Sequence, residues 1–181
     1  MRTVLAAGLL AISGFSCISA RAEVVEASAA AMQIRHVVEI GAPPARVFRT
    51  FLAINRWWSD EHTYSGSAAN LSLRAAPGGC FCERLPQGGG VVHMTVVNVA
   101  PNQRITLSGA LGPLQTAGVA GALTVSLAPK DAGTEITLVY NVGGYYPSGL
   151  SSVAAGVDRV LQEQLERLKR QVETGKPAAG S

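Results

Sequence analysis

The strongest periodic pattern in the chain is an apolar stripe over residues 148–172. Its apolar residues recur every three or four positions from Leu150 to Val172, which is the spacing of one face of a helix. Charged residues such as Asp158 and Glu163 occupy the opposite face. The spacing therefore predicts a long terminal helix whose apolar face must be covered by another element of the fold.

A half-buried strand is predicted over residues 32–40, because apolar and polar residues alternate there and His36 falls on the more apolar face. A Gly-Ala-Pro-Pro sequence ends this strand, and Pro44 suits the first turn of a helix. The apolar spacing after Pro44 predicts one short helix and then a second helix or turn that reaches about Glu61.

Short apolar runs separated by turn sequences fill the middle of the chain. Each interruption is too short to hold a crossover helix, so neighbouring strands should pair antiparallel. The order is one strand, two short helices, about six further strands and the terminal helix. This order predicts an α+β domain in which a curved antiparallel sheet grips one helix. The six further strands are expected at residues 71–73, 80–85, 91–99, 104–108, 121–128 and 134–142.

Five short motifs, taken in order, resemble the SRPBCC superfamily, whose START-related members share the helix-grip fold. The closest branch contains homologues of the heat-shock-protein ATPase activator and polyketide cyclase-like proteins. Each motif alone is only a turn or a helix start. The motifs are Ala-Pro-Pro-Ala-Arg-Val-Phe at 42–48 with Trp57-Trp58, Pro-Gly-Gly at 77–79, Val-Ala-Pro at 99–101 before Arg104-Ile105, Gly-Thr-Glu-Ile-Thr-Leu at 133–138, and the terminal amphipathic helix.

This resemblance implies a helix-grip domain with a curved sheet of six to seven strands and a cavity between the sheet and the terminal helix. The superfamily hosts lipid carriers, hormone and pigment binders, polyketide cyclases, oxygenase subunits and co-chaperones on the same frame. The chain lacks the cysteine and histidine spacings of an oxygenase iron–sulfur domain. The resemblance therefore implies a fold and a place for a ligand, without selecting one activity.

The N-terminus has the three parts of a secretory leader: a positive start at Met1-Arg2, an apolar run over residues 4–18, and a small-residue site ending at Ala22. The run is shorter than the roughly 20 apolar residues that a membrane-spanning helix needs. A lipoprotein signal would use Cys17, but the residues before it fit that signal poorly. We therefore expect cleavage after Ala22 and a periplasmic or secreted protein, which argues against a cytosolic heat-shock ATPase partner.

Removal of residues 1–22 leaves 159 of the 181 residues and changes the charge. The full chain has 15 Lys and Arg against 12 Asp and Glu, and the leader holds two of the basic residues, so the balance becomes 13 against 12, or +1. No basic cluster suits a phosphate backbone, so no nucleic-acid partner is expected. No integral membrane segment is expected after cleavage. The remaining chain should comprise a flexible lead-in over 23–31, a single domain over 32–173 and a disordered tail over 174–181.

Cys80 and Cys82 are the only cysteines outside the leader, and on a strand they point to the same face. Their Cα atoms would be roughly 6 to 7 Å apart in an extended strand, so we expect no disulfide between them. A hairpin that pairs residues 85 and 90 would place Cys82 opposite His93 and Cys80 opposite Thr95. Two thiols and an imidazole could then hold zinc or copper. Alternatively the cysteines are small apolar residues that line the cavity, and we favour this interpretation, with no metal and no cofactor.

Other residues are candidates for the wall of the cavity. Trp57 and Trp58 fall where the early helices should border its mouth, although aromatic pairs also serve in cores. Tyr145 follows Gly143-Gly144, which could form a hinge before the terminal helix or an ordinary turn. Val153 and Val157 lie on the apolar stripe nearest to that turn.

No catalytic motif is recognisable in the sequence: it contains no nucleophile elbow, phosphate-binding loop or zinc-protease helix. Glu83, His36 and His93 are the only acid–base candidates by strand position, and the sequence does not pair them.

We therefore expect an exported protein that holds a small apolar or amphipathic ligand between its sheet and its terminal helix. The alternatives are a cavity enzyme of the polyketide cyclase or dehydratase type, and a protein-interaction module without a ligand. An apolar cavity of a few hundred Å³ would support binding, buried ionisable groups with perturbed pKa values would support catalysis, and a filled core would support the interaction role.

Overall fold

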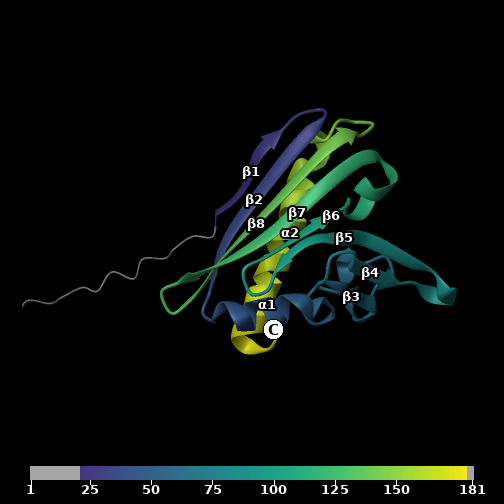
Figure 1. Cartoon of the computed structure of the whole chain (residues 1–181). Helices are drawn as coiled ribbons and strands as arrows, with labels where there is room; N and C mark the ends of the chain where they lie inside the picture. Colours follow the sequence, from purple (N-terminus) through teal and green to yellow (C-terminus); the bar gives the residue numbers. More distant parts are fainter. Residues whose placement is uncertain (1–20, 179–181) are drawn as a thin grey trace, which may run out of the picture.

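One curved sheet and one long helix dominate the fold (Figure 1). The computed structural model describes residues 21–178. Its eight strands follow the order β1-β2-β8-β7-β6-β5-β4-β3, and every neighbouring pair is antiparallel. Helix α2 lies against one face of this sheet, so the α+β helix-grip prediction is confirmed.

From β2 onwards the main helices and strands occur in the predicted order. The strands are β1 (Arg21–Ala27), β2 (Ala31–Ile40), β3 (Leu71–Leu73), β4 (Cys80–Arg84), β5 (Gly90–Ala100), β6 (Arg104–Ser108), β7 (Gly118–Lys130) and β8 (Gly133–Tyr145). The helices are α1 (Pro44–Leu52) and α2 (Ser151–Thr174), with short 3-10 helices η1 (Ile54–Arg56), η2 (Asp60–His62), η3 (Ala68–Asn70), η4 (Pro86–Gly88) and η5 (Gly112–Thr116).

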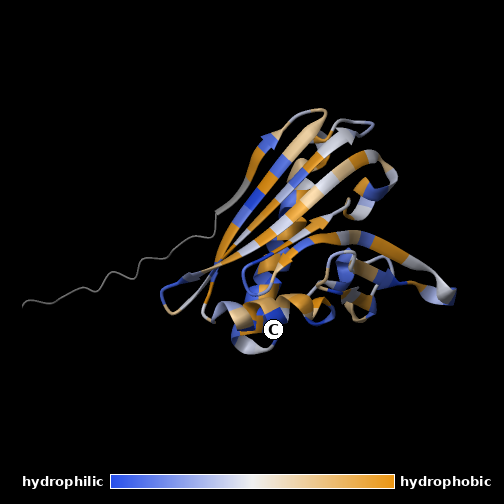
Figure 2. Ribbon diagram, in the orientation of Figure 1, coloured by the Kyte–Doolittle hydropathy of each residue, from blue (hydrophilic) through white to orange (hydrophobic). Residues whose placement is uncertain are grey.

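Alternation along the strands sets the face that packs against α2 (Figure 2). On β2, Met32 and Ile34 are buried, and their partners on β8, Val142 and Tyr140, are buried as well. Directly paired residues share a face of an antiparallel sheet, so the two strands present one apolar surface. This surface covers the apolar stripe of α2, which the periodicity of the sequence predicts.

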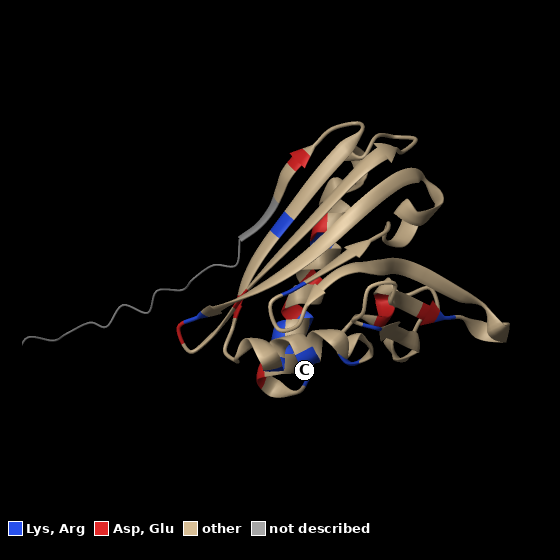
Figure 3. Ribbon diagram, in the orientation of Figure 1, with Lys and Arg blue, Asp and Glu red and all other residues tan. Residues whose placement is uncertain are grey.

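The apolar stripe of α2 is buried at Leu161, Leu165, Leu168 and Val172. Figure 3 shows acidic and basic residues along the same helix, while the long strands carry few charges. The helix ends at Gly175, which has a φ of 77° and closes the last turn with its N–H on the Gln171 carbonyl. A glycine suits this left-handed position because it has no Cβ.

The segment expected to be a flexible lead-in is instead ordered. Residues Arg21–Ala27 form edge strand β1, which pairs with β2. Next to it, the carbonyls of Ser28 and Ala29 accept hydrogen bonds from the N–H groups of Ser151 and Leu150 at the start of α2 (2.8 and 2.9 Å). Backbone pairing holds this segment and Val24 packs against the core, so no periodic apolar pattern reveals it.

The two ends of the chain differ in how far the structure describes them. Most of the expected leader, residues 1–20, lies outside the described residues, as do residues 179–181 of the expected disordered tail. The part of the tail that is described folds back on α2, where Arg170 Nε donates to the Pro177 carbonyl (2.8 Å). Between residues 21 and 178, no helix is both long and apolar enough to cross a membrane.

Candidate functional site

The space between the sheet and α2 is small and enclosed. Its volume is about 20 Å³, which is room for about one water molecule. The expected cavity of a few hundred Å³ is therefore absent from this part of the described fold. The lining is apolar except for one amide and consists of Phe51, Ile54, Trp57, Trp58, Leu73, Phe81, Leu107, Leu123, Leu138, Leu161, Gln164 and Leu165.

Trp57 and Trp58 both line this small cavity, and both are held by hydrogen bonds. Trp57 is 2% exposed, and its Nε1–H donates to the Phe51 carbonyl (3.1 Å). The Nε1–H of Trp58 donates to the His62 carbonyl (2.9 Å). Arg167 on α2 binds the carbonyls of both tryptophans at 2.8 and 3.2 Å. The pair is therefore a fixed part of the core as well as a part of the cavity wall.

Gln164 is the one polar residue in this lining. Its Oε1 accepts a hydrogen bond from the Ser59 N–H (2.9 Å), so the amide fixes the turn after the tryptophans. Its Nε2 is buried and has no hydrogen-bond partner among the described residues. An unpaired buried donor destabilises the fold. The hydrogen bond from Ser59 to Oε1 therefore offsets the cost of the unpaired Nε2.

Cys80 and Cys82 form a disulfide, contrary to the expectation from an extended strand. Their Cα atoms are 5.4 Å apart, closer than the extended spacing, at the point where the register of β4 and β5 changes between Phe81 and Cys82. The bonded sulfur atoms lie on the face opposite to the buried Phe81. The hypothesis that both thiols converge with His93 on a metal is therefore wrong.

The register change is a bulge on β5 that contains His93. Cys80 pairs with Thr95 as expected, but Cys82 pairs with Val92 instead of His93. The two residue steps from Cys80 to Cys82 on β4 are thus paired with three steps, from Thr95 to Val92, on β5. The extra residue on β5 leaves both His93 and Met94 buried. The bulge turns the imidazole towards the face that Phe81 occupies.

On that face His93 meets Glu83, and the two side chains form a buried pair. The Nε2 of His93 lies 2.9 Å from the Glu83 Oε2, and the side chains are 6% and 0% exposed. The Glu83 carboxylate also accepts the N–H groups of Ser65 (2.5 Å) and Tyr64 (3.1 Å). The ring of His93 packs against Phe81 and stacks on Tyr64, with centroid separations of 4.7 and 5.9 Å.

The surroundings shift the pKa values of both members of this pair downward. Burial lowers the pKa of His93, and the hydrogen bond and charge of Glu83 oppose the shift only in part. Burial would raise the pKa of Glu83, but hydrogen bonds from Ser65, Tyr64 and His93 together outweigh it and lower the pKa. At neutral pH the pair is therefore a carboxylate and a neutral imidazole.

A larger open groove lies beside this pair. Its volume is about 520 Å³, and it runs along the first half of β5 where β6 has ended. Gln115 ties η5 to the Val92 carbonyl (3.1 Å), and the Tyr64 hydroxyl reaches the Gly112 carbonyl (2.9 Å). The groove is lined by Gly90, Val91, Val92, His93, Met94, Thr95, Ser108, Gly109, Ala110, Gln115 and Val119.

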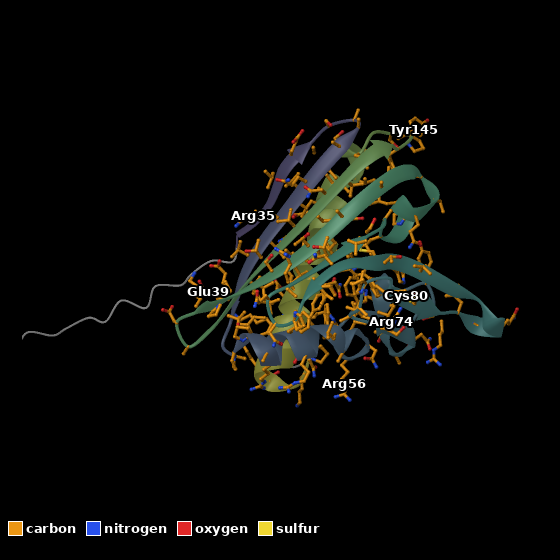
Figure 4. The ribbon with its side chains drawn as sticks, in the orientation of Figure 1. Arg35, Glu39, Arg56, Arg74, Cys80 and Tyr145 are labelled. Atoms are coloured by element: carbon orange, nitrogen blue, oxygen red, sulfur yellow. A yellow bond between two sulfur atoms is a disulfide. The ribbon has the colours of Figure 1, made fainter. Side chains whose placement is uncertain are left out.

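The other residues expected at the cavity lie elsewhere. Tyr145 is 71% exposed at the end of β8, well away from Cys80 (Figure 4). Val153 and Val157 are partly buried and pack against the core, but they line neither the small cavity nor the groove. Gly143-Gly144, considered as either a hinge or an ordinary turn, lies inside β8 and is paired with β7.

His36 forms a second histidine–carboxylate contact, at the sheet–helix interface. Its Nε2 lies 3.1 Å from the Asp158 Oδ1, but the two atoms lack hydrogen-bond geometry and have no other partner among the described residues. Burial lowers the pKa of His36, while Asp158 and Glu166 raise it to a smaller extent. His36 is therefore separate from the groove. Within residues 24–178 no group of three or more His, Cys, Asp or Glu side chains is placed to hold a metal.

Comparison with known families identifies the class of this fold. The family described as polyketide cyclase / dehydrase and lipid transport matches residues 31–173, so the chain belongs to that family. The family is of the SRPBCC type, which confirms the resemblance drawn from the sequence motifs and supports a ligand-binding fold. Among curated proteins, none matches the chain.

Solved structures with low sequence identity share the same fold. The Aha1 dimer from Colwellia psychrerythraea is 18% identical, with a TM-score of 0.57, over 80% of this chain and 98% of that one. CalU16 from Micromonospora echinospora is 14% identical, with a TM-score of 0.53, over 87% and 88% of the two chains. A conserved protein of unknown function, EF2215 from Enterococcus faecalis, is 14% identical, with a TM-score of 0.61, over 90% and 81%. These identities bear on the fold alone.

The Glu83–His93 pair is the feature that the sequence analysis missed. Both residues were acid–base candidates, but a regular hairpin would place His93 opposite Cys82 and away from Glu83. The signal lies in the pattern of β5, where His93 and Met94 are buried in succession. Two consecutive inward residues break the alternation of a strand and mark a bulge.

Proposed function

We propose that this protein binds a small amphipathic molecule in the open groove beside β5, with His93 at its floor. The observation that carries the proposal is the coincidence of a groove of about 520 Å³ with a buried, oriented histidine. A few polar groups in a concave site are what fixes the orientation of a small ligand. Family membership points to the same general class of function.

The proposed site is the groove and not the space between the sheet and α2. That space holds about 20 Å³, which is too little for any molecule larger than water. A filled core is also what a protein-interaction module would have. The groove is the reason to favour a small ligand, because it offers volume and a directed polar group at the same place.

Export is the second part of the proposal. The leader-like N-terminus motivates it, and the Cys80–Cys82 disulfide is consistent with it, because disulfides persist mainly in oxidising compartments. Cleavage after Ala22 would leave Glu23–Ala27 available for β1. Mass spectrometry of protein recovered from the periplasm or medium tests this: we expect a chain that starts at Glu23. Recovery of the uncleaved chain in the cytosol would contradict export.

A binding experiment with matched variants tests the groove. Val91 lines it, whereas Val97 on the same strand is 52% exposed and does not. We expect the fluorescence of anilinonaphthalene sulfonate, or its displacement by fatty acids and aromatic acids, to report binding to the wild-type protein. Val91→Trp should weaken that binding at least tenfold, while Val97→Trp should leave it unchanged. Equal effects of the two substitutions would contradict a site in the groove.

A further inference from the structure

The two nitrogens of the His93 ring have different surroundings. The Nε2 faces the Glu83 carboxylate at 2.9 Å. The Nδ1 has no hydrogen-bond partner among the described residues, and it is not one of the enclosed polar atoms. His93 is also one of the residues that line the groove.

The Glu83 carboxylate determines which nitrogen carries the proton. A carboxylate only accepts hydrogen bonds, so the neutral imidazole must place its proton on Nε2. The lone pair of the ring is then on Nδ1. The carboxylate itself is held by hydrogen bonds from the N–H groups of Tyr64 and Ser65. The fixed carboxylate in turn orients the ring through Nε2. This is the arrangement in which a base is aligned by a third group.

We propose that His93 is a general base towards a molecule bound in the groove, and that Glu83 is its positioning residue. This inference rests on the proposed binding function and specifies the ligand: a small apolar or amphipathic compound with a weakly acidic C–H or O–H bond. The ligand would lie with that proton towards Nδ1. The site is thereby an enzyme site as well as a binding site.

The chemical step needs no further reagent. The C–H or O–H bond of the bound molecule breaks, its proton moves to Nδ1 of His93, and the bonding electron pair stays on the molecule as an enolate or oxyanion. The imidazolium that forms faces the Glu83 carboxylate, which stabilises its positive charge. Return of the proton to the same or another atom of the molecule restores the neutral ring.

The charged and titratable groups around His93 are few. Glu83 from β4 and Tyr64 from the segment between η2 and η3 contact the ring. Burial keeps the pKa of His93 below its ordinary value of 6.5, so the base is unprotonated at neutral pH. The rate of proton removal should therefore rise with pH to a midpoint below 6.5 and then stay level.

Nitrobenzisoxazole is a suitable probe, because it is small and apolar and releases a coloured phenolate when a base removes its ring proton. The C–H electron pair forms the nitrile as the N–O bond breaks, so the reaction is balanced without an oxidant. We expect the wild-type protein to accelerate this elimination and His93→Gln to lower the second-order rate constant at least about a hundredfold. The matched control is His62→Gln, since His62 bonds Glu163 outside the groove and should not matter.

Three outcomes decide the inference. Loss of rate in His93→Gln but not in His62→Gln, with a midpoint below 6.5, supports it. Binding of amphipathic probes in the groove without any acceleration that depends on His93 overturns the general base and leaves the binding function standing. Absence of both binding and acceleration overturns the two proposals together.

The positioning role of Glu83 has its own readout. In Glu83→Gln the carboxylate charge is lost, so the midpoint of the pH–rate profile should move to lower pH and the plateau should fall. Nitrogen NMR of the wild-type ring adds a test that does not depend on any variant folding. We expect the Nε2–H tautomer, and a ring with its proton on Nδ1 would overturn the assignment.

Discussion

The Nε2 of His93 lies 2.9 Å from the carboxylate of Glu83, beside a bulge in the pairing of β4 and β5. Glu83 sits on β4 with its oxygens held by two backbone N–H groups, and β5 supplies the extra residue that turns His93 inward. The result is an oriented imidazole at a residue that lines the open groove.

Acidification should destabilise the protein in two steps. The folded pKa values of His93 and His36 are below their ordinary value of 6.5, so the unfolded chain binds protons first and stability falls as the pH drops below 6.5. The pKa of Glu83 is below 4.5, so its contribution is lost at lower pH, below 4.5. Urea unfolding between pH 8 and pH 4 measures this. A free energy of unfolding that stayed constant between pH 7 and pH 5 would contradict it.

Substitution of Glu83 should cost more stability than its small change in volume implies. In Glu83→Gln the amide nitrogen replaces one oxygen and meets a backbone N–H donor in either orientation, Ser65 at the Oε1 position or Tyr64 at the Oε2 position, so we expect a loss of about 1–3 kcal/mol. Glu61→Gln is the control, because Glu61 is exposed and should change stability by less than about 0.5 kcal/mol. Denaturant titration of both variants gives the comparison, and equal losses would argue against a structural role for the carboxylate.

Much of the fold follows from the sequence because periodicity reports burial. The apolar stripe of α2 and the alternation of β2 and β8 repeat over many positions, so one residue that departs from the pattern does not change the prediction. The site depends on a single inserted residue on β5, and a regular hairpin register moves His93 to the other face. The wrong prediction about the Cys80–Cys82 disulfide has another origin, since a fully extended strand would keep the two Cα atoms further apart than 5.4 Å.

The Cys80–Cys82 disulfide should add modest stability, because it closes a very short loop. The chain-entropy estimate for so few residues is about 1.5 kcal/mol. We expect the double substitution of Cys80 and Cys82 by Ser to lower the free energy of unfolding by about this amount and to leave the fold intact. Thiol titration of unfolded protein from its own compartment should find no free thiol at these positions. Two free thiols per mature chain would contradict the disulfide.

Gln164 should stabilise the turn after the tryptophans through its bond to Ser59. In Gln164→Met the Ser59 N–H loses its buried acceptor, and we expect a loss of about 1–3 kcal/mol despite the more apolar side chain. Gln162→Met on the same helix is the control, since Gln162 bonds only Glu166. Thermal denaturation compares the two variants. A more stable Gln164→Met protein would show that the cost of the unpaired Nε2 exceeds the value of the bond to Ser59.

Two further features could not be predicted from the sequence. Strand β1 is held by backbone hydrogen bonds to β2, which depend little on side-chain identity and leave no apolar pattern. The volume between the sheet and α2 depends on how twelve side chains interlock, of which Leu107 and Leu161 are examples. Hydropathy shows that such residues are buried but does not show whether they leave a space among them.

The most direct test of the site is an amide NMR titration of the wild-type protein with anilinonaphthalene sulfonate. We expect shift changes confined to the groove, at Val91 to Thr95, Ser108 to Ala110 and Gln115, together with a change at the His93 ring. Changes centred instead on Trp57, Trp58 and Leu161 would place the ligand between the sheet and α2. That result, or the absence of any change at saturating probe, would contradict a binding site over His93.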